Sequence, residues 1–290
     1  MAFKNLKNSL YIKFYALVCK LNLSRFCKIK KDNRPVSPFK LVFFCGKTGI
    51  EYLNASMVSV YKSWDTVPEI IIITDGTPAD VIKKKLIKWP QQLEIFTWEF
   101  CGEYFKAKGK TDLNDYAAKD IWGKKFVGIC YCAEKYTILY SDTDILWFSS
   151  PVLEDLQSRS VVKMCQDVGY HYSEPLLNAV NQKHILNHAP LNAGLIYAGG
   201  KFAEFPQWNE LCKYLSLHPD HRTEQTSFAV LNNYFNPQQY FKQEEIFIQV
   251  DDMHSLKYTK TKNPAIWARH YVNLKNTSFW RDFIYLILGK

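Results

Sequence analysis

The sequence ILYSDTDILWF, residues 138–148, decides the fold prediction because it places two carboxylates inside an otherwise apolar segment. The apolar residues on both sides are typical of a buried β-strand, and burying an ionised carboxylate is costly unless a positive group compensates its charge. Asp142 and Asp144 are separated by one residue, so on an extended chain their side chains point the same way. Both can therefore reach one hard cation, and Mg²⁺ and Mn²⁺ prefer such oxygen ligands. A turn with solvated acids at the end of a strand remains the alternative interpretation.

The segments on both sides of this stretch predict an α/β domain. Before it we expect strands at 41–46, 68–77 and 93–100 and helices at 49–64, 78–89 and near 115–135. After it we expect strands at 160–168, 194–198, 246–250 and 266–272 and helices at 205–217 and 224–235. Strands that are continuously apolar indicate a mostly parallel sheet with helices on both faces. Ligands of such sheets bind at the carboxyl ends of the strands, where Asp75 and the DTD sequence both fall.

Composition and cysteine usage are typical of a packed protein in a reducing compartment. The chain has 290 residues, of which 47% are hydrophobic and 16% aromatic, enough for one large α/β domain. Its eight cysteines are scattered and mostly lie in apolar segments, which favours buried, reduced thiols over a disulfide framework. No apolar stretch of about 18 residues, the length that spans a bilayer, occurs in the chain. We therefore expect a cytoplasmic protein without a transmembrane helix.

The positive charge is concentrated at the N-terminus. The formal net charge is +9, and residues 1–34 contain nine Lys or Arg and one acid, a net +8 that leaves +1 for the other 256 residues. Apolar residues at near-helical spacing are interleaved with these charges: Phe3, Leu6, Leu10, Phe14, Leu17 and Leu21. We therefore predict a basic amphipathic helical arm at 1–34 and a domain at 39–290. The arm either binds an anionic membrane surface or packs on the domain. A nucleic-acid partner is not expected, because the domain itself carries no basic excess.

Three later segments, read together with the DTD stretch, resemble motifs of the GT-A glycosyltransferases, specifically the nucleotide-sugar-dependent families similar to family 8 and its bacterial relatives. These segments follow the DTD stretch in the family's order: PLNAGLIYAGG (190–200), EQTSFAVL (224–231) and ARHYVNLKNTSFW (268–280). The resemblance covers roughly residues 40–282, and its specificity lies in the ordered set. It implies a GT-A-like, Rossmann-like sheet flanked by helices.

The resemblance also implies a metal site and a phosphate site. Asp144 would be the principal metal ligand, Asp142 would bind the metal or the ribose of the donor, and His270 would be the late metal ligand. The implied cofactor is Mn²⁺ or Mg²⁺, together with a nucleotide-sugar donor, most often a UDP-sugar. Lys124 and Lys125 precede the DTD strand where similar proteins place a basic residue over the donor phosphates or sugar.

Further positions follow from the same resemblance. Asn192 would face the donor sugar or the acceptor, and Glu224 and Gln225 would line the reaction centre. Lys275 is the only candidate for a basic residue that binds the diphosphate from the late segment. Two positions depart from the pattern of the family, because Asn273 stands where Gly is common and Glu224 stands where Asp is commoner.

The predicted function is metal-dependent transfer of a sugar from a nucleotide diphosphate donor to a hydroxyl of a glycan or glycolipid precursor. Similarity to family 8 favours retention at the anomeric carbon, and Asp75 is expected to help bind the nucleoside. A location in the cytoplasm, with the arm on the inner face of the membrane, would fit this function. Two alternatives remain: a sugar-phosphate nucleotidyltransferase, although the loop CGKTGIEY (45–52) lacks arginine, and a catalytically silent protein that kept the fold.

Overall fold

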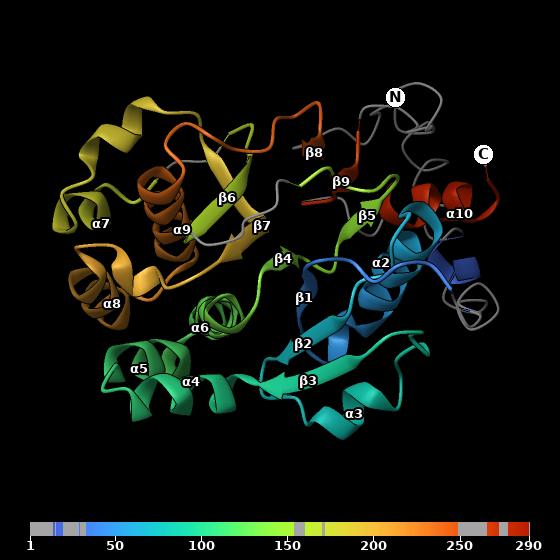
Figure 1. The fold of residues 1–290 in the computed structure, drawn as a ribbon, viewed down its shortest axis with the longest axis horizontal. Coiled ribbons are helices and arrows are strands. Elements are labelled where there is room, and N and C mark those ends of the chain that lie inside the picture. Colours follow the sequence, from blue (N-terminus) through green and yellow to red (C-terminus); the bar gives the residue numbers. More distant parts are fainter. Residues whose placement is uncertain are drawn as a thin grey trace, which may run out of the picture.

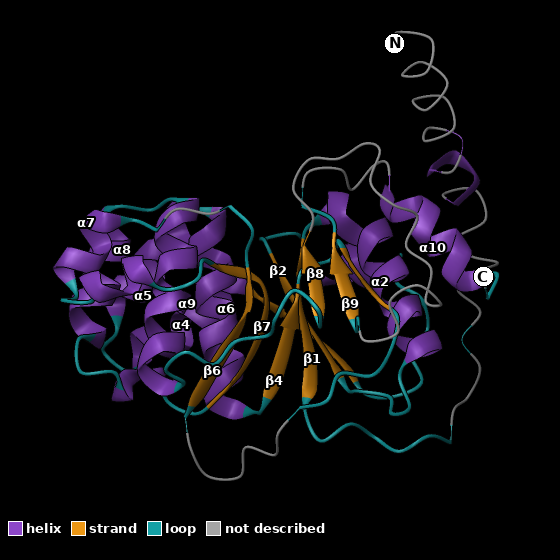
Figure 2. Ribbon diagram, turned by 90° about the horizontal axis from the view of Figure 1, so that it is seen from above, coloured by secondary structure: helices purple, strands orange, loops and turns teal. Residues whose placement is uncertain are grey.

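The fold is built around one six-stranded sheet whose strands lie in the order β3-β2-β1-β4-β7-β6. The computed structural model describes residues 14, 16–19, 29, 33–153, 160–169, 172–248, 266–272 and 278–289. Helices cover both faces of the sheet: α4 to α9 lie on one side, and α2 and α10 lie on the other (Figures 1 and 2). This arrangement is the mostly parallel α/β sheet that the apolar strands predict.

The first half of the chain forms the parallel part of the sheet. It contains β1 (Lys40–Cys45), η1 (Lys47–Gly49), α2 (Ile50–Ser63), β2 (Ile70–Thr74), α3 (Ala79–Lys83), β3 (Leu93–Thr97), α4 (Trp98–Ala107), α5 (Thr111–Lys119), α6 (Ile121–Lys135) and β4 (Ile138–Ser141). Strand β1 pairs in parallel with both β2 and β4, and β2 pairs in parallel with β3. All five residues of β2 are buried, as its unbroken run of β-branched side chains predicts.

The second half of the chain adds the antiparallel edge. It contains β6 (Val161–Gln166), α7 (Glu174–Ala179), η2 (Lys183–Asn187), β7 (Leu191–Gly199), η3 (Phe202–Glu204), α8 (Trp208–Leu217) and α9 (His221–Phe235). Strand β7 runs antiparallel to both β4 and β6, so β7 alone is reversed in the sheet. Helix α9 lies along β6, where the side-chain oxygens of Asn232 and Asn236 accept hydrogen bonds from the backbone of the strand.

The DTD sequence lies at the end of strand β4, as predicted, but the apolar residues after it join a different sheet. The chain turns at residues 142–144, and β5 (Ile145–Trp147) leaves the main sheet. Strand β5 pairs antiparallel with β9 (Ala268–His270), which pairs in parallel with β8 (Ile246–Ile248), so these strands form a second, three-stranded sheet. All residues of β4 and β5 are buried. The apolar pattern predicts this burial, but it does not indicate which sheet a strand joins.

Several predicted boundaries shift, and local capping explains two of the shifts. Residues 98–100 belong to helix α4 instead of to a strand, because the Thr97 hydroxyl accepts a hydrogen bond from Phe100 N at 3.3 Å. The helix predicted near 115–135 is two helices, since Asp120 is extended and its carboxylate accepts from Trp122 N at 3.1 Å. The helix predicted at 78–89 is only α3. The strand predicted at 194–198 starts earlier, at Leu191.

Residues 14 and 16–19 of the N-terminal arm are helical, and Cys19 of this segment contacts the last helix. Cys19 is fully buried, and its thiol donates to the backbone oxygen of Trp280, the first residue of α10 (Trp280–Ile287), at 3.6 Å. Phe14 and Leu17 are exposed, by 60% and 56%. The other arm positions that define the apolar spacing lie outside the described residues, so the boundary between arm and domain stays a prediction.

Two further predictions concern cysteines and membrane helices. The seven cysteines within the described residues are buried, as predicted, and none of them forms a disulfide; Cys27 lies outside these residues. In the part of the chain that the structure describes, no helix has the length and hydropathy needed to span a bilayer.

Candidate active site

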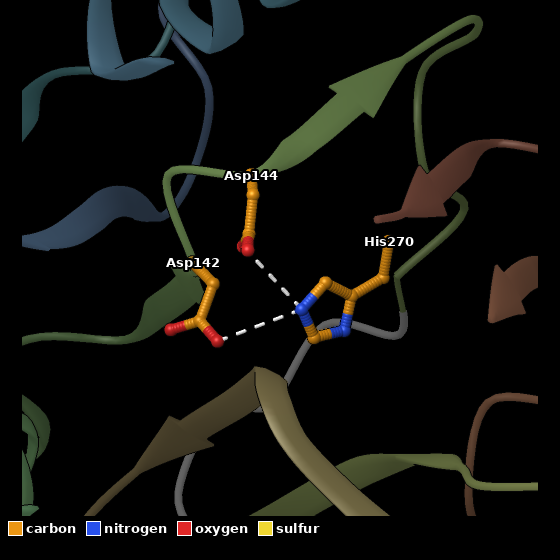
Figure 3. Close-up of side chains that lie close together, drawn as sticks. All are labelled: Asp142, Asp144 and His270. Carbon is orange, nitrogen blue, oxygen red and sulfur yellow. Dashed lines mark ion pairs between the residues drawn. The ribbon is translucent and has the colours of Figure 1, made fainter. Parts of the chain in front are cut away.

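Asp142, Asp144 and His270 come together at the turn between the two sheets (Figure 3). Asp142 follows β4, Asp144 precedes β5, and His270 is the last residue of β9. The His270 Nε2 atom lies 3.4 Å from Asp144 Oδ1 and 3.7 Å from Asp142 Oδ2. One ligand atom from each side chain lies within 4.8 Å of the other two. Asp144 and His270 are buried, whereas Asp142 is 29% exposed at its side chain.

Backbone hydrogen bonds hold this turn on two sides. Asp142 N donates to Gly194 O of β7 at 2.7 Å, and Tyr271 N donates to Asp144 O at 3.1 Å. Because β5 also pairs with β9, Ile145 lies directly opposite His270. The positions of both carboxylates and the imidazole therefore depend on three strands that are distant in sequence.

Gly194, in the Asn-Ala-Gly sequence of β7, leaves the space that the imidazole occupies. A Cβ atom at Gly194 would lie 2.2 Å from His270 Cε1, which no real contact reaches, and 2.8 Å from Asn192 Oδ1. The same residue provides the backbone oxygen for Asp142 N. A larger residue at position 194 would therefore clash with the His270 ring, which explains why glycine stands there.

The donor set fits a hard divalent cation. Two carboxylates face a single imidazole, and the one proton on Nε2 cannot neutralise both of them. Burial by itself would lower the pKa of His270, but its hydrogen bond to Asp144 and the charges of Asp144 and Asp142 raise that pKa above the ordinary value. Two carboxylate oxygens and one imidazole nitrogen suit Mn²⁺ or Mg²⁺ and leave positions for other ligands.

Lys125 places a buried positive charge beside this group. It lies on α6 and is 4% exposed, and its Nζ donates to Ala193 O at 3.0 Å. The same Nζ lies 3.5 Å from Asp142 Oδ1 and 3.3 Å from Glu224 Oε1. Burial lowers the pKa of Lys125, yet the two carboxylates raise it by more, so the ammonium stays charged. Tyr140, which sequence reasoning missed, donates its hydroxyl to Asp142 Oδ1.

Glu224, in the first turn of α9, is completely buried. Neither of its carboxylate oxygens makes a well-aligned hydrogen bond within the described residues, so its contact with Lys125 is an ion pair only. Burial raises the pKa of Glu224 to about 7, although the charge of Lys125 opposes this rise. A buried carboxylate with unused acceptor oxygens is costly by itself, and a ligand with hydroxyl groups can satisfy it.

The side chains of Asn192 and Gln225 both contact Asp167, which the sequence analysis did not identify. Asn192 Nδ2 donates to Asp167 Oδ2 at 3.0 Å, and Gln225 Nε2 donates to the same oxygen at 3.4 Å and to Leu191 O at 2.6 Å. The Asn192 side chain also accepts a hydrogen bond from Gly194 N at 2.7 Å. Gly194 in turn contacts Asp142, so this cluster is joined to the group of Asp142, Asp144 and His270, called the metal group below. Asp167 directly follows β6, and an acid just past the end of a strand is the one signal that the sequence offered.

Asp75 and Lys124 form a separate group farther along the same edge. Lys124 Nζ donates to Asp75 O at 2.8 Å, and Asp75 Oδ1 accepts from both the backbone and the hydroxyl of Thr77. The loop after β1 lies between this group and the DTD turn. A Cβ at Gly46 would lie 2.0 Å from Asp75 Oδ2, and one at Gly49 would lie 3.8 Å from Thr143 Oγ1. The predicted pair is thus on the expected edge, but its described contacts do not include the metal group.

The last predicted site residue, Lys275, lies outside the described residues, as does Asn273. Whether Lys275 approaches the site therefore stays a prediction.

Comparison with known proteins identifies the fold. No protein-family model matches the chain, and no curated protein matches it. Solved structures do match: an active-site mutant of LgtC, in which glutamine is replaced by glutamate, has a TM-score of 0.51 and 13% identity over 86% of this chain and 95% of that one. The bifunctional glycosyltransferase WbbM has a TM-score of 0.52 and 12% identity over 90% of this chain and 51% of that one.

Mouse xyloside xylosyltransferase 1 has a TM-score of 0.52 and 10% identity over 82% of this chain and 98% of that one. These structures are GT-A glycosyltransferases, and at such low identity the likeness identifies the fold alone. The chain has the GT-A fold, which confirms the predicted fold class. A specific relation to family 8 stays a prediction.

Proposed function

We propose that this protein is a metal-dependent glycosyltransferase that moves a sugar from a nucleotide diphosphate donor, most often a UDP-sugar, to a hydroxyl of a glycan or lipid-linked acceptor. The single observation that carries the proposal is the convergence of Asp142, Asp144 and His270 at the carboxyl edge of a GT-A sheet. Such an edge is where α/β sheets bind their ligands. The order of the motifs in the sequence supports the same function independently.

In this proposal the three side chains hold a divalent ion, Mn²⁺ or Mg²⁺. When bound, the ion supplies Lewis-acid stabilisation of the negative charge on a leaving diphosphate. Lys125 adds a fixed positive charge next to Asp142, in a buried setting where such a charge acts strongly. Lys124 and Asp75 bind the nucleoside diphosphate farther along the edge, and Lys275, outside the described residues, stays the predicted basic residue of the late segment.

The sugar would lie between the metal group and the Asn192–Asp167–Gln225 cluster. Asp167 already accepts two hydrogen bonds, which fixes the amides of Asn192 and Gln225 in one orientation. The unused oxygens of Glu224 accept hydrogen bonds from sugar hydroxyls. Glycosyl transfer passes through an oxocarbenium-like transition state, so polar groups close to the ring contribute directly to the rate. We propose retention at the anomeric carbon, following the resemblance, and NMR of the product anomer tests it.

The test is turnover of a panel of nucleotide sugars with Mn²⁺ by the full-length protein and by Asp144→Asn. The substitution keeps the shape of the side chain and removes one ligand charge. We expect turnover of one or more UDP-sugars that chelation of the metal abolishes, and no turnover by the variant at an unchanged melting temperature. Equal turnover by Asp144→Asn would remove the metal role. Release of pyrophosphate from a nucleoside triphosphate and a sugar phosphate would instead identify a nucleotidyltransferase, and inactivity on every donor would favour a silent binding protein.

We also propose that the arm at 1–34 binds the anionic inner face of a membrane and brings the site to lipid-linked acceptors. Its net charge of +8 suits such a surface. Phe14 and Leu17 are exposed apolar side chains on the described part of the arm, while Cys19 on the same helix is buried against α10. One face of this helix thus packs on the domain and another presents apolar groups outward.

A further inference from the structure

We infer that Asp282, on α10, is a positioning residue that sets the affinity of the site for its metal ion by fixing the strand that carries His270. The inference rests on the proposed metal site and deepens it. Asp282 is 1% exposed and is a point of convergence for three side chains. Its Oδ2 accepts from Arg269 at 2.7 Å and from the Tyr271 hydroxyl at 2.8 Å, and its Oδ1 accepts from Arg281 at 2.7 Å.

Two of these partners are the immediate neighbours of His270 in the chain. Side chains alternate between the two faces of a strand, so Arg269 and Tyr271 point away from the face that His270 presents to the carboxylates. A single buried carboxylate therefore fixes the residue before the metal ligand and the residue after it. Strand β9 has only three residues, so its pairing with β5 and β8 provides few hydrogen bonds of its own.

The imidazole itself has little direct support. A metal-bound histidine usually donates its second ring nitrogen to a carboxylate or a backbone oxygen, which fixes the ring orientation. Within the described residues, the buried Nδ1 of His270 has no hydrogen-bond partner. Ring orientation is therefore set by the backbone on either side and by the contact with Gly194. Asp282 fixes that backbone through Arg269 and Tyr271. It thereby orients the imidazole indirectly, as a hydrogen-bond partner of the ring does directly in other metal sites.

The charge of Asp282 matters as much as its geometry. Arg269 is 2% exposed, and the Asp282 carboxylate pairs with its guanidinium and with that of Arg281. Breaking a buried ion pair by removing one partner is strongly unfavourable. Asp282→Asn removes one negative charge beside these two guanidiniums, so the surroundings of His270 become more positive and oppose the binding of a dication. Loss of Asp282 thus weakens metal binding both by loosening β9 and by adding positive charge near the site.

A purely structural role for Asp282, as a bond that docks α10, makes a different prediction. Phe283 is the next residue of the same helix, is fully buried in an apolar cluster with Phe279 and Trp280, and takes no part in the hydrogen bonds of Asp282. Phe283→Leu loosens the docking of α10 without changing the charge or the hydrogen bonds around β9. It is the matched control for Asp282→Asn.

The experiment measures Mn²⁺ affinity of the full-length protein by electron paramagnetic resonance titration, below the melting temperature of every variant. We expect Asp282→Asn to weaken Mn²⁺ binding by roughly tenfold to a hundredfold, the usual effect of losing an outer partner of a metal site. Tyr271→Phe removes one hydrogen bond and no charge, so we expect a smaller weakening in the same direction. Phe283→Leu should lower the melting temperature and leave Mn²⁺ affinity at the wild-type value.

The outcomes separate this inference from the proposed function. Wild-type protein that binds no Mn²⁺ would refute the metal site, and the inference with it. Wild-type protein that binds Mn²⁺, with Asp282→Asn binding equally well or weakened no more than Phe283→Leu, would refute the inference alone. If Asp282→Asn does not fold, Tyr271→Phe decides: unchanged Mn²⁺ affinity in that variant overturns the role of Asp282 in positioning His270.

Discussion

Gly194 shows how a residue without a side chain defines the site. Its missing Cβ leaves room for the His270 ring, and its backbone oxygen fixes the amide of Asp142. The sequence identified Asp142, Asp144 and His270 through the order of motifs, and the structure brings these three together. Asp167 and Tyr140 were not identified, because one acid after a strand and one tyrosine within a strand are common. Only packing shows that they contact Asn192 and Asp142.

The first residue-scale prediction concerns Gly194→Ala. The added methyl group would lie 2.2 Å from His270 Cε1, so the imidazole must move away from the two carboxylates. We expect Mn²⁺ affinity to fall by roughly tenfold or more, by analogy with the loss of other groups that orient a ligand. Gly169→Ala is the control, since nothing lies within 4 Å of a Cβ at that exposed position. Equal Mn²⁺ affinity in the two variants would show that the imidazole does not bind the metal.

A second residue-scale prediction concerns the pH dependence of stability. The pKa of Glu224 is about 7 in the folded protein, against an ordinary value of 4.5, so the folded state binds this proton more tightly than the unfolded chain does. The stabilisation from the bound proton is therefore complete below pH 4.5 and is lost as the pH rises to about 7. The difference corresponds to roughly 3 kcal/mol.

Urea unfolding of metal-free protein at several pH values tests this. The free energy of unfolding of Glu224→Gln, measured relative to wild type, should rise by that amount between pH 4.5 and 7. Lys125 then pairs with Asp142 alone, which adds an offset that does not change over this range. Parallel pH profiles for the two proteins would mean that the pKa of Glu224 is the same in the folded and the unfolded state.

At the scale of elements, helix α9 compensates for the position of β6 at the edge of the sheet. An edge strand presents unpaired backbone groups that a protein must cover. The side-chain oxygens of Asn232 and Asn236 accept from Met164 N at 2.8 Å and Val162 N at 3.1 Å. The amide of Asn232 also donates to the backbone oxygens of Asn236 and Gln239. Glu224 and Gln225 lie near the start of this helix, so its docking also positions these two side chains of the candidate site.

We therefore predict that Asn232→Ala destabilises the protein by roughly 1–3 kcal/mol, because Met164 N is left buried without a partner. Urea denaturation measures the change. Asn233→Ala is the control on the same helix, since its side chain contacts His184 at the surface and its loss should change stability by less than about 0.5 kcal/mol. Equal effects of both substitutions would contradict the role of Asn232 in covering the strand edge.

Element types were predictable from the sequence, but their partners were not. The continuous apolar runs correctly indicated buried strands, and β2 is buried along its whole length. The same signal could not show that 138–148 divides between two sheets, since β4 and β5 are equally buried in different surroundings. Helix ends were misplaced where a side-chain cap, such as that of Asp120, overrides the apolar spacing.

At the scale of the whole molecule, the candidate site joins residues from Lys125 to His270. Such long-range proximity follows from sheet order, in which β4 lies beside β7 although β6 precedes β7 in the chain. The GT-A fold was predictable because four motifs occur in order, a signal that needs no geometry. The position of Asp282 was not predictable, because Arg269 and Tyr271 reach it only once α10 docks beside β9.

The arm gives the whole-molecule prediction. Full-length protein should sediment with vesicles that contain phosphatidylserine at low salt, and less so at high salt, because the arm carries most of the net charge. The double substitution Phe14→Ser with Leu17→Ser should weaken this binding, since both side chains are exposed apolar groups. Vesicles of phosphatidylcholine alone are the control. Absence of binding by the wild-type protein would mean that the arm serves only to pack against α10.

The most direct test of the account is calorimetric titration of UDP into the full-length protein with Mn²⁺ and, separately, with a chelator. In the proposed site the bound cation would supply the positive charge that a diphosphate requires, so we predict binding in Mn²⁺, none in the chelator, and none in Asp144→Asn under either condition. UDP binding that is the same with and without Mn²⁺, or that survives in Asp144→Asn, would contradict a cation shared between this triad and the donor.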